Sequence, residues 1–140
     1  MAAYNEEKNI AAIIAQLQKM SYSIIVCNDG SSDMTGEIAE KMGATVINHK
    51  RNLGFGAALR SIFLKANELN ADILVTIDAD GQHNPLEIKD ILKPIEDNEA
   101  DVVIGSRFSG KTSKIPKYRI IGIKAINKLT SSSSENKLID

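Results

Sequence analysis

The chain has 140 residues, of which 43% are hydrophobic and 25% charged, a balance typical of one globular domain. Its formal net charge of −1 argues against a general nucleic-acid-binding protein, and its one cysteine excludes an internal disulfide. No apolar run has the length of a membrane-spanning helix and the first residues do not resemble a secretion signal, so we expect a cytoplasmic protein.

Short apolar runs alternate with segments of helical periodicity along the chain. Buried strands are predicted at residues 23–27, 45–48, 73–77 and 101–105. Apolar residues recur at i, i+3, i+4 and i+7 in three predicted helices, at 10–17, 59–66 and 88–95, and a last helix is expected near 118–129. Unbroken apolar strands are typical of a parallel sheet that is covered on both faces. We therefore expect an α/β fold, doubly wound and Rossmann-like.

Helix ends are predicted from a few local signals. Asn5 and Asn84 stand where N-caps would be, and Pro85 fits the first helical position after Asn84. Pro94 should kink the helix near residues 88–95 or end it early. The serine-rich residues 130–140 look like a linker-like tail of a single domain that spans 1–140.

The predicted pattern opens with a helix, whereas an α/β sheet normally begins with a strand. We therefore expect the first strand to be missing and the chain to be a fragment, truncated at both ends. An open sheet edge exposes backbone donors and acceptors, which a second copy could pair with. A homodimer is expected on this ground.

Three polar clusters follow the predicted strands or precede the first helix. They are residues 4–7 (Tyr-Asn-Glu-Glu), 28–33 (Asn-Asp-Gly-Ser-Ser-Asp) and 78–83 (Asp-Ala-Asp-Gly-Gln-His). Ligands of parallel sheets bind outside the carboxyl ends of the strands, so these clusters are expected to converge there. For residues 28–33, a plain helix start capped by Ser31 or Ser32 is an equally good interpretation.

Asp78 and Asp80 follow an apolar run with one residue between them. In an extended chain such residues point to the same side, so their carboxylates and the Gln82 amide oxygen could hold Mg²⁺ or Mn²⁺. A turn that merely caps the next helix is the alternative.

The remaining chemical groups are less specific. Gly54 and Gly56 precede a predicted helix and indicate either an anion site or a flexible helix entry. Arg107 begins a basic loop that would either meet a phosphate or remain solvated. Cys27 is expected in the core, and His49 and His83 at the surface.

Taken together, these motifs resemble the family 2 glycosyltransferases with the GT-A fold, in particular the dolichol- or polyprenyl-phosphate mannosyl- and glucosyltransferases. The resemblance covers nearly the whole chain. It rests on residues 4–7, 28–33 and 78–83, on Asn52 with Gly54 and Gly56, and on Gly105-Ser106-Arg107-Phe108.

The resemblance implies a site for a nucleotide-sugar. Its binding residues would be Tyr4, Asn5, Glu6, Asp29, Gly54, Asp78, Ala79 and Asp80. Asp78, Asp80 and Gln82 would hold the metal, and Asp80, Arg107 and Arg119 would be catalytic. Asp140 looks like the first residue of an acceptor-side motif of the family.

We therefore expect a metal-dependent glycosyltransferase that moves a hexose from a GDP-mannose or UDP-glucose type donor to a polyprenyl or dolichyl phosphate. Its place would be the cytoplasmic face of a membrane. Other interpretations are a fragment that binds the nucleotide-sugar without transferring it, a family 2 enzyme with a polysaccharide or other acceptor, and a receiver-like signalling domain with one phosphorylatable aspartate.

Overall fold

The computed structural model describes residues 1–105 and divides the chain into two compact units, Met1–Lys89 and Asp90–Asp140, each considered by itself. The first unit contains a parallel sheet with the strand order β1-β2-β3. Its strands are β1 (Ala2–Ala3), β2 (Ile25–Asn28) and β3 (Thr45–Asn48). The predicted helix near 118–129 and the tail at 130–140 lie outside the described residues.

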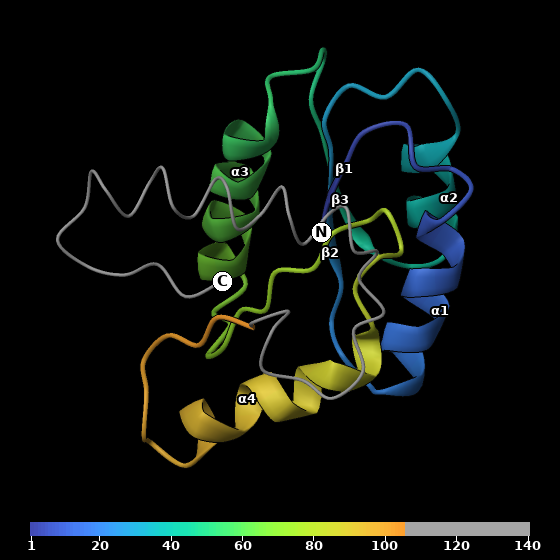
Figure 1. Ribbon diagram of the computed structural model, residues 1–140. Helices are drawn as coiled ribbons and strands as arrows, with labels where there is room; N and C mark the ends of the chain where they lie inside the picture. Colours follow the sequence, from blue (N-terminus) through green and yellow to red (C-terminus); the bar gives the residue numbers. More distant parts are fainter. Residues whose placement is uncertain (106–140) are drawn as a thin grey trace, which may run out of the picture. The chain divides into compact units, whose positions relative to one another are not determined.

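Helices cover both faces of this sheet, as predicted for an α/β fold. α1 (Ile10–Lys19) and α2 (Thr35–Lys41) lie on one side and α3 (Phe55–Glu68) on the other (Figure 1). A short 3₁₀ helix, η1 (Pro85–Glu87), follows and leads into α4 (Ile88–Glu96). None of the helices within residues 1–105 is long and apolar enough to cross a membrane.

The apolar face of each helix explains its position. The four apolar residues that predicted the first helix are buried in α1: Ile10, Ile13, Ile14 and Leu17. On the other side of the sheet, Ala58 and Ile62 of α3 pack in one cluster with Cys27 of β2. Cys27 is therefore a core residue, as expected, and its thiol is free.

Strand β1 corrects the expectation that the first strand is missing. Ala2 and Ala3 pair in parallel with Cys27 and Asn28. The N–H of Asp29 extends this pairing by donating to the Ala3 carbonyl at 2.9 Å. The edge of β2 that we expected to be open is therefore paired with β1, and β1 and β3 are the outer strands of the sheet within the described residues. The homodimer stays a prediction.

Two predicted strands are not strands in the structure. Residues 73–77 and 101–105 belong to none of the ladders within the described residues. An apolar run indicates that its side chains favour burial in a core. A strand also needs a neighbouring strand whose backbone completes its hydrogen bonds. Ile77 is buried without such a ladder, and Val102 and Ile104 are exposed.

The helix ends agree only in part with the sequence signals. Asn84 does cap η1, because its side chain accepts a hydrogen bond from the Leu86 N–H at 3.1 Å. Asn5 does not cap α1, which begins only at Ile10 after Asn9. α4 includes Pro94 and ends two residues later, at Glu96, so the proline stands close to the end of the helix.

A close backbone approach fixes the loop after β2. Gly30 has φ +71°, and a Cβ added there would lie 2.3 Å from the Arg51 carbonyl carbon and 2.5 Å from the Asn52 nitrogen. Only glycine can occupy this position without moving the loop after β3.

Replacing Gly30 by alanine should therefore destabilise the protein by about 2 kcal/mol or more, because strain at positive φ adds to the backbone clash. Urea unfolding followed by circular dichroism measures this difference. Gly56→Ala is the matched control: its Cβ would meet nothing within 4 Å, and alanine favours a helix by up to about 1 kcal/mol. Equal stabilities of the two variants would contradict the prediction.

Candidate functional site

The segment that enters α1 is hydrogen-bonded to the loop that follows β2. The N–H of Asn5 donates to Ser31 Oγ at 3.0 Å, and the N–H of Glu6 donates to Thr35 Oγ1 at 2.7 Å. Asn5 Oδ1 in turn accepts from the Ser32 N–H at 2.8 Å. The first two polar clusters thus converge, as the strand-edge geometry predicted.

These contacts also show that Ser31 and Ser32 are not helix caps. α2 begins only at Thr35, and the two serine hydroxyls are hydrogen-bonded to Asn5 instead. Asp33 supports this loop, since its Oδ1 accepts from the Thr35 N–H at 3.0 Å. Burial opposes ionisation of Asp33, but hydrogen bonds from Thr35 and Glu7 outweigh it and hold the pKa of Asp33 below its ordinary value.

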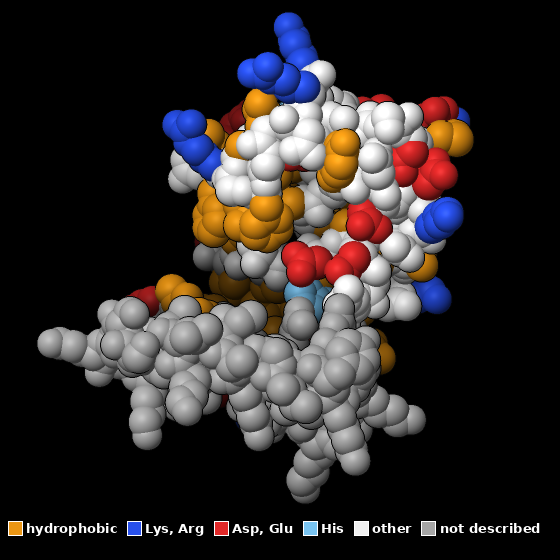
Figure 2. Space-filling model, turned by 45° about the horizontal axis from the view of Figure 1, so that its top comes forward, with side chains coloured by type: hydrophobic (Ala, Val, Ile, Leu, Met, Phe, Trp, Pro, Cys, Tyr) orange, Lys and Arg blue, Asp and Glu red, His pale blue; other side chains and the backbone are white. Residues whose placement is uncertain are grey.

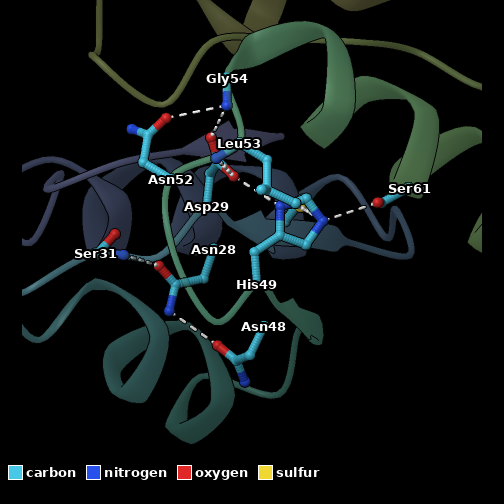
Figure 3. Close-up of polar contacts among 10 residues, drawn as sticks. Asn28, Asp29, Ser31, Asn48, His49, Asn52, Leu53, Gly54 and Ser61 are labelled. Atoms are coloured by element: carbon cyan, nitrogen blue, oxygen red, sulfur yellow. Dashed lines mark hydrogen bonds and ion pairs between the residues drawn. The ribbon is translucent and has the colours of Figure 1, made fainter.

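Asp29 lies at the end of β2 and gathers donors from the loop after β3 (Figure 3). It is only 4% exposed. Its Oδ1 accepts from the Leu53 N–H at 2.9 Å, and its Oδ2 from the Gly54 N–H at 2.8 Å. We call residues 52–54 the 52–54 loop; Asn52 Oδ1 also accepts from the Gly54 N–H at 3.0 Å.

His49 supplies a further contact to Asp29 and is not the surface residue that we expected. Its Nδ1 lies 2.7 Å from Asp29 Oδ1, and its Nε2 lies 2.9 Å from Ser61 Oγ of α3. The side chain is only 11% exposed. No local sequence signal indicates this pairing, because the partners of His49 are 20 and 12 positions away.

The charge state of Asp29 follows from these contacts. Burial favours the neutral carboxyl, but the hydrogen bonds from Leu53, His49 and Gly54 favour the carboxylate and lower the pKa of Asp29 below its ordinary value. The pKa of the nearby Cys27 thiol changes in the opposite direction. Burial has the larger effect and the charge of Asp29 the smaller one, and together they raise this pKa to about 11. Asp29 is therefore an anion at neutral pH, and the buried Cys27 is a neutral thiol in the core.

A cavity of about 120 Å³ opens beside Asp29. It brings together Tyr4, Asp29 and Gly54, three of the residues that the sequence predicts for a nucleotide-sugar. Asn52 and Phe55 line it as well. Phe55 was not among the predicted site residues, although it directly follows a predicted one.

A second cavity, of about 350 Å³, lies between the start of α1 and the loop that follows residues 78–80. Lys8 and Asn9 line one side, and Gln82 and His83 the other. Residues 4–9 therefore lie between the 28–35 loop and the 81–85 loop, which brings the third polar cluster next to the first.

Asp78 and Asp80 are both partly exposed. Asp80 Oδ1 accepts from the Gln82 N–H at 2.8 Å, so this loop orients one of its own carboxylates. His83 Nδ1 accepts from the Asp78 N–H at 3.2 Å, and an accepting nitrogen bears no proton. The contact of 3.8 Å between this atom and Asp78 Oδ2 is therefore not an ion pair.

This donor set fits a hard divalent cation. Asp78, Asp80 and Gln82 offer carboxylate and amide oxygens on a loop that solvent reaches. Figure 2 shows acidic side chains exposed on one face, beside a histidine. Within residues 1–105 no group of three or more His, Cys, Asp or Glu side chains could hold a metal ion, so an ion here would need oxygens from elsewhere.

The predicted catalytic residues Arg107 and Arg119 lie outside the described residues. Five other predicted site residues line neither cavity: Asn5, Glu6, Asp78, Ala79 and Asp80. Asn5 and Glu6 instead fix the segment that bears Tyr4, and Ala79 is buried between the two aspartates.

Residues 1–138 match the model of the glycosyl transferase family 2. An uncharacterised protein of Methanocaldococcus jannaschii is 39% identical over 91% of this chain and 54% of its own length. The UDP-N-acetylglucosamine–dolichyl-phosphate N-acetylglucosaminyltransferase of Methanococcus voltae is 38% identical over 76% of this chain and 49% of its own length.

A dolichyl-phosphate hexose transferase of Haloferax volcanii is 32% identical over 94% of this chain and 56% of its own length. The chain thus spans about half the length of these curated relatives.

Replacing Asp29 by asparagine tests its buried charge. Because the folded-state pKa of Asp29 is lowered, its carboxylate stabilises the fold above the ordinary pKa of 3.8 and loses this effect as the pH falls through the folded value. Asp29→Asn should cost about 2 kcal/mol at pH 7 and make the stability less dependent on pH below about 4. Urea unfolding between pH 2 and 7 measures both.

Asp72→Asn, at an exposed carboxylate, is the control and should change neither quantity by more than about 0.5 kcal/mol. A wild-type protein and an Asp29→Asn variant that lose stability in parallel on acidification would refute this role.

Proposed function

The chain belongs to glycosyltransferase family 2, and from this membership we propose that it transfers a hexose from a nucleotide-sugar to a polyprenyl or dolichyl phosphate. The observation that carries the proposal is the cavity shared by Tyr4, Asp29 and Gly54 beside the sheet. The names of two relatives, a dolichyl-phosphate hexose transferase and a dolichyl-phosphate N-acetylglucosaminyltransferase, support the lipid phosphate as acceptor.

The nucleoside of the donor is proposed to occupy the cavity beside Asp29. The Asp29 carboxylate is ionised and can accept a further hydrogen bond from a base N–H. Tyr4 is half-exposed at the rim, and Phe55 lines the same cavity, so both rings are available to an aromatic base. Asn5 and Glu6 contribute indirectly, by holding Tyr4 through Ser31 and Thr35.

The donor diphosphate is proposed to lie near the loop with Asp78 and Asp80. These two carboxylates, with Gln82, would hold Mg²⁺ or Mn²⁺, which would offset the charge that develops on the departing nucleotide. Ala79, buried between them, keeps the two aspartates on the open side of the chain. The Gln82 N–H fixes the orientation of Asp80 before any ligand arrives.

Two arginines complete the proposal. Arg107 and Arg119 are assigned to the transferred sugar and the acceptor phosphate, because a planar guanidinium binds phosphate oxygens in pairs. A phosphate acceptor is already anionic, so a dedicated general base is not needed. The cytoplasmic face of a membrane is the proposed place of action, where Cys27 remains a thiol and a lipid phosphate is within reach.

Binding of the donor without transfer is the competing function. A transfer assay separates the two: the protein is given UDP-glucose or GDP-mannose, Mn²⁺ and a short polyprenyl phosphate, and nucleotide release and glycolipid are followed together. Glycolipid that forms only when all three are present supports transfer. Nucleotide binding without glycolipid favours the binding function, and transfer to a polysaccharide alone would replace the proposed acceptor.

Asp80→Asn tests the metal loop separately. We expect Mn²⁺ to tighten UDP or GDP binding to the wild-type protein by about tenfold or more, and the variant to lose this gain. Its fold should remain intact, because Asp80 is partly exposed and contributes little to the core. Isothermal titration calorimetry with and without Mn²⁺ measures the effect, with Asp72→Asn as control. Equal affinities of the wild-type protein under both conditions would refute the metal site.

A further inference from the structure

We infer that His49, braced by Ser61, is a positioning residue of the proposed donor cavity: it fixes the Asp29 carboxylate and, through it, the 52–54 loop. This role rests on the proposed function, which assigns the cavity to the donor. His49 does not line the cavity itself, so it acts through Asp29.

The chemistry of a carboxylate sets the direction of the hydrogen bond between His49 and Asp29. A carboxylate only accepts, so His49 Nδ1 must donate to Asp29 Oδ1, 2.7 Å away. The other ring nitrogen, Nε2, lies 2.9 Å from the Ser61 hydroxyl, which can accept from it or donate to it. Figure 3 shows the ring between its two partners.

The hydrogen bonds join three elements, of which α3 contributes Phe55 and Ala58 to the lining of the cavity. Ser61 belongs to α3, His49 directly follows β3, and Asp29 directly follows β2. Asp29 Oδ1 accepts from both His49 and the Leu53 N–H, while its Oδ2 accepts from the Gly54 N–H. With both oxygens held in this way, the carboxylate cannot turn in the cavity without breaking at least one hydrogen bond.

Asp29, His49 and Ser61 also have the order of a catalytic triad, but their positions argue against that role. Ser61 lines neither of the two cavities, so a substrate there does not meet its hydroxyl. His49 is only 11% exposed, and the sulfur of the buried Cys27 lies 3.6 Å from its Nε2. The enclosed His49 ring can therefore orient the Asp29 carboxylate but cannot reach a substrate in either cavity.

The first test needs no ligand and therefore decides the inference independently of the proposed function. His49→Ala should increase amide hydrogen exchange at Leu53 and Gly54 by about tenfold, because Asp29 loses the partner that orients it. His49→Asn should restore near wild-type exchange, since its amide can donate from nearly the same position as Nδ1. Ile14→Ala, at a fully buried position of α1, controls for general destabilisation.

The second test measures UDP and GDP binding by calorimetry for the same variants and for Ser61→Ala. His49→Ala should lower the affinity for the nucleotide that the wild-type protein binds by about tenfold, and Ser61→Ala should lower it by less. His49→Asn and Ile14→Ala should change this affinity by no more than about twofold. In the transfer assay, the loss should appear in KM and leave kcat unchanged.

Three outcomes would overturn the inference: unchanged exchange at Leu53 and Gly54 in His49→Ala, the same change in Ile14→Ala, or no rescue by asparagine. If the wild-type protein binds neither nucleotide while the exchange results hold, the proposed function fails and His49 still positions Asp29.

Discussion

A buried carboxylate must be surrounded by donors, and at Asp29 this requirement organises the whole edge of the sheet. Its side chain is only 4% exposed, and the donors come from residues that follow it by 20 to 25 positions. Leaving such a charge unpaired would cost several kcal/mol, of the order of the net stability of a small domain. The loop after β3 is therefore held where its backbone N–H groups can reach the carboxylate. Gly30 makes this approach possible because it has no Cβ to obstruct residues 51 and 52.

Side-chain acceptors also hold the segment before α1, although only one of them carries a charge. Asp33 and Thr35 receive the backbone N–H groups of residues 6 and 7, so the segment before α1 is tied to the segment before α2. The two networks share the short stretch at residues 28–35. This one polar stretch thus places the Asp29 carboxylate at the cavity and also holds the segment that bears Tyr4, another residue of the cavity lining.

The sequence predicted the parts of the fold that depend on apolar periodicity. The buried stripe of α1, the position of β3 and the helices on both faces follow from residues that recur at regular spacing. Strand β1 was missed because two alanines make no apolar run; it exists through backbone pairing with β2. Residues 73–77 differ in the opposite way: their apolar run predicts a strand, but they pair with no neighbouring strand within the described residues.

Within the site, the sequence predicted residue types at the ends of elements but not their partners. Tyr4, Asp29 and Gly54 do meet at one cavity, as the edge of a parallel sheet requires. His49 is not at the surface position that the sequence predicts, because a lone histidine in a sequence does not reveal a carboxylate 20 positions away. The residue type of Asn5 predicts a helix cap, whereas in the structure its side chain accepts a hydrogen bond from the Ser32 N–H and joins two loops.

The shortness of β1 also has a consequence for the order of folding. Its pairing joins residues about 25 positions apart through Met1 and the two strand residues alone, so it gives little free energy in return for closing a long loop. Helix α1 can form from local contacts, and β2 and β3 enclose a shorter segment. We therefore expect β1 to dock late and to detach first, and the wall that bears Tyr4 would be completed only after the rest of the sheet has formed.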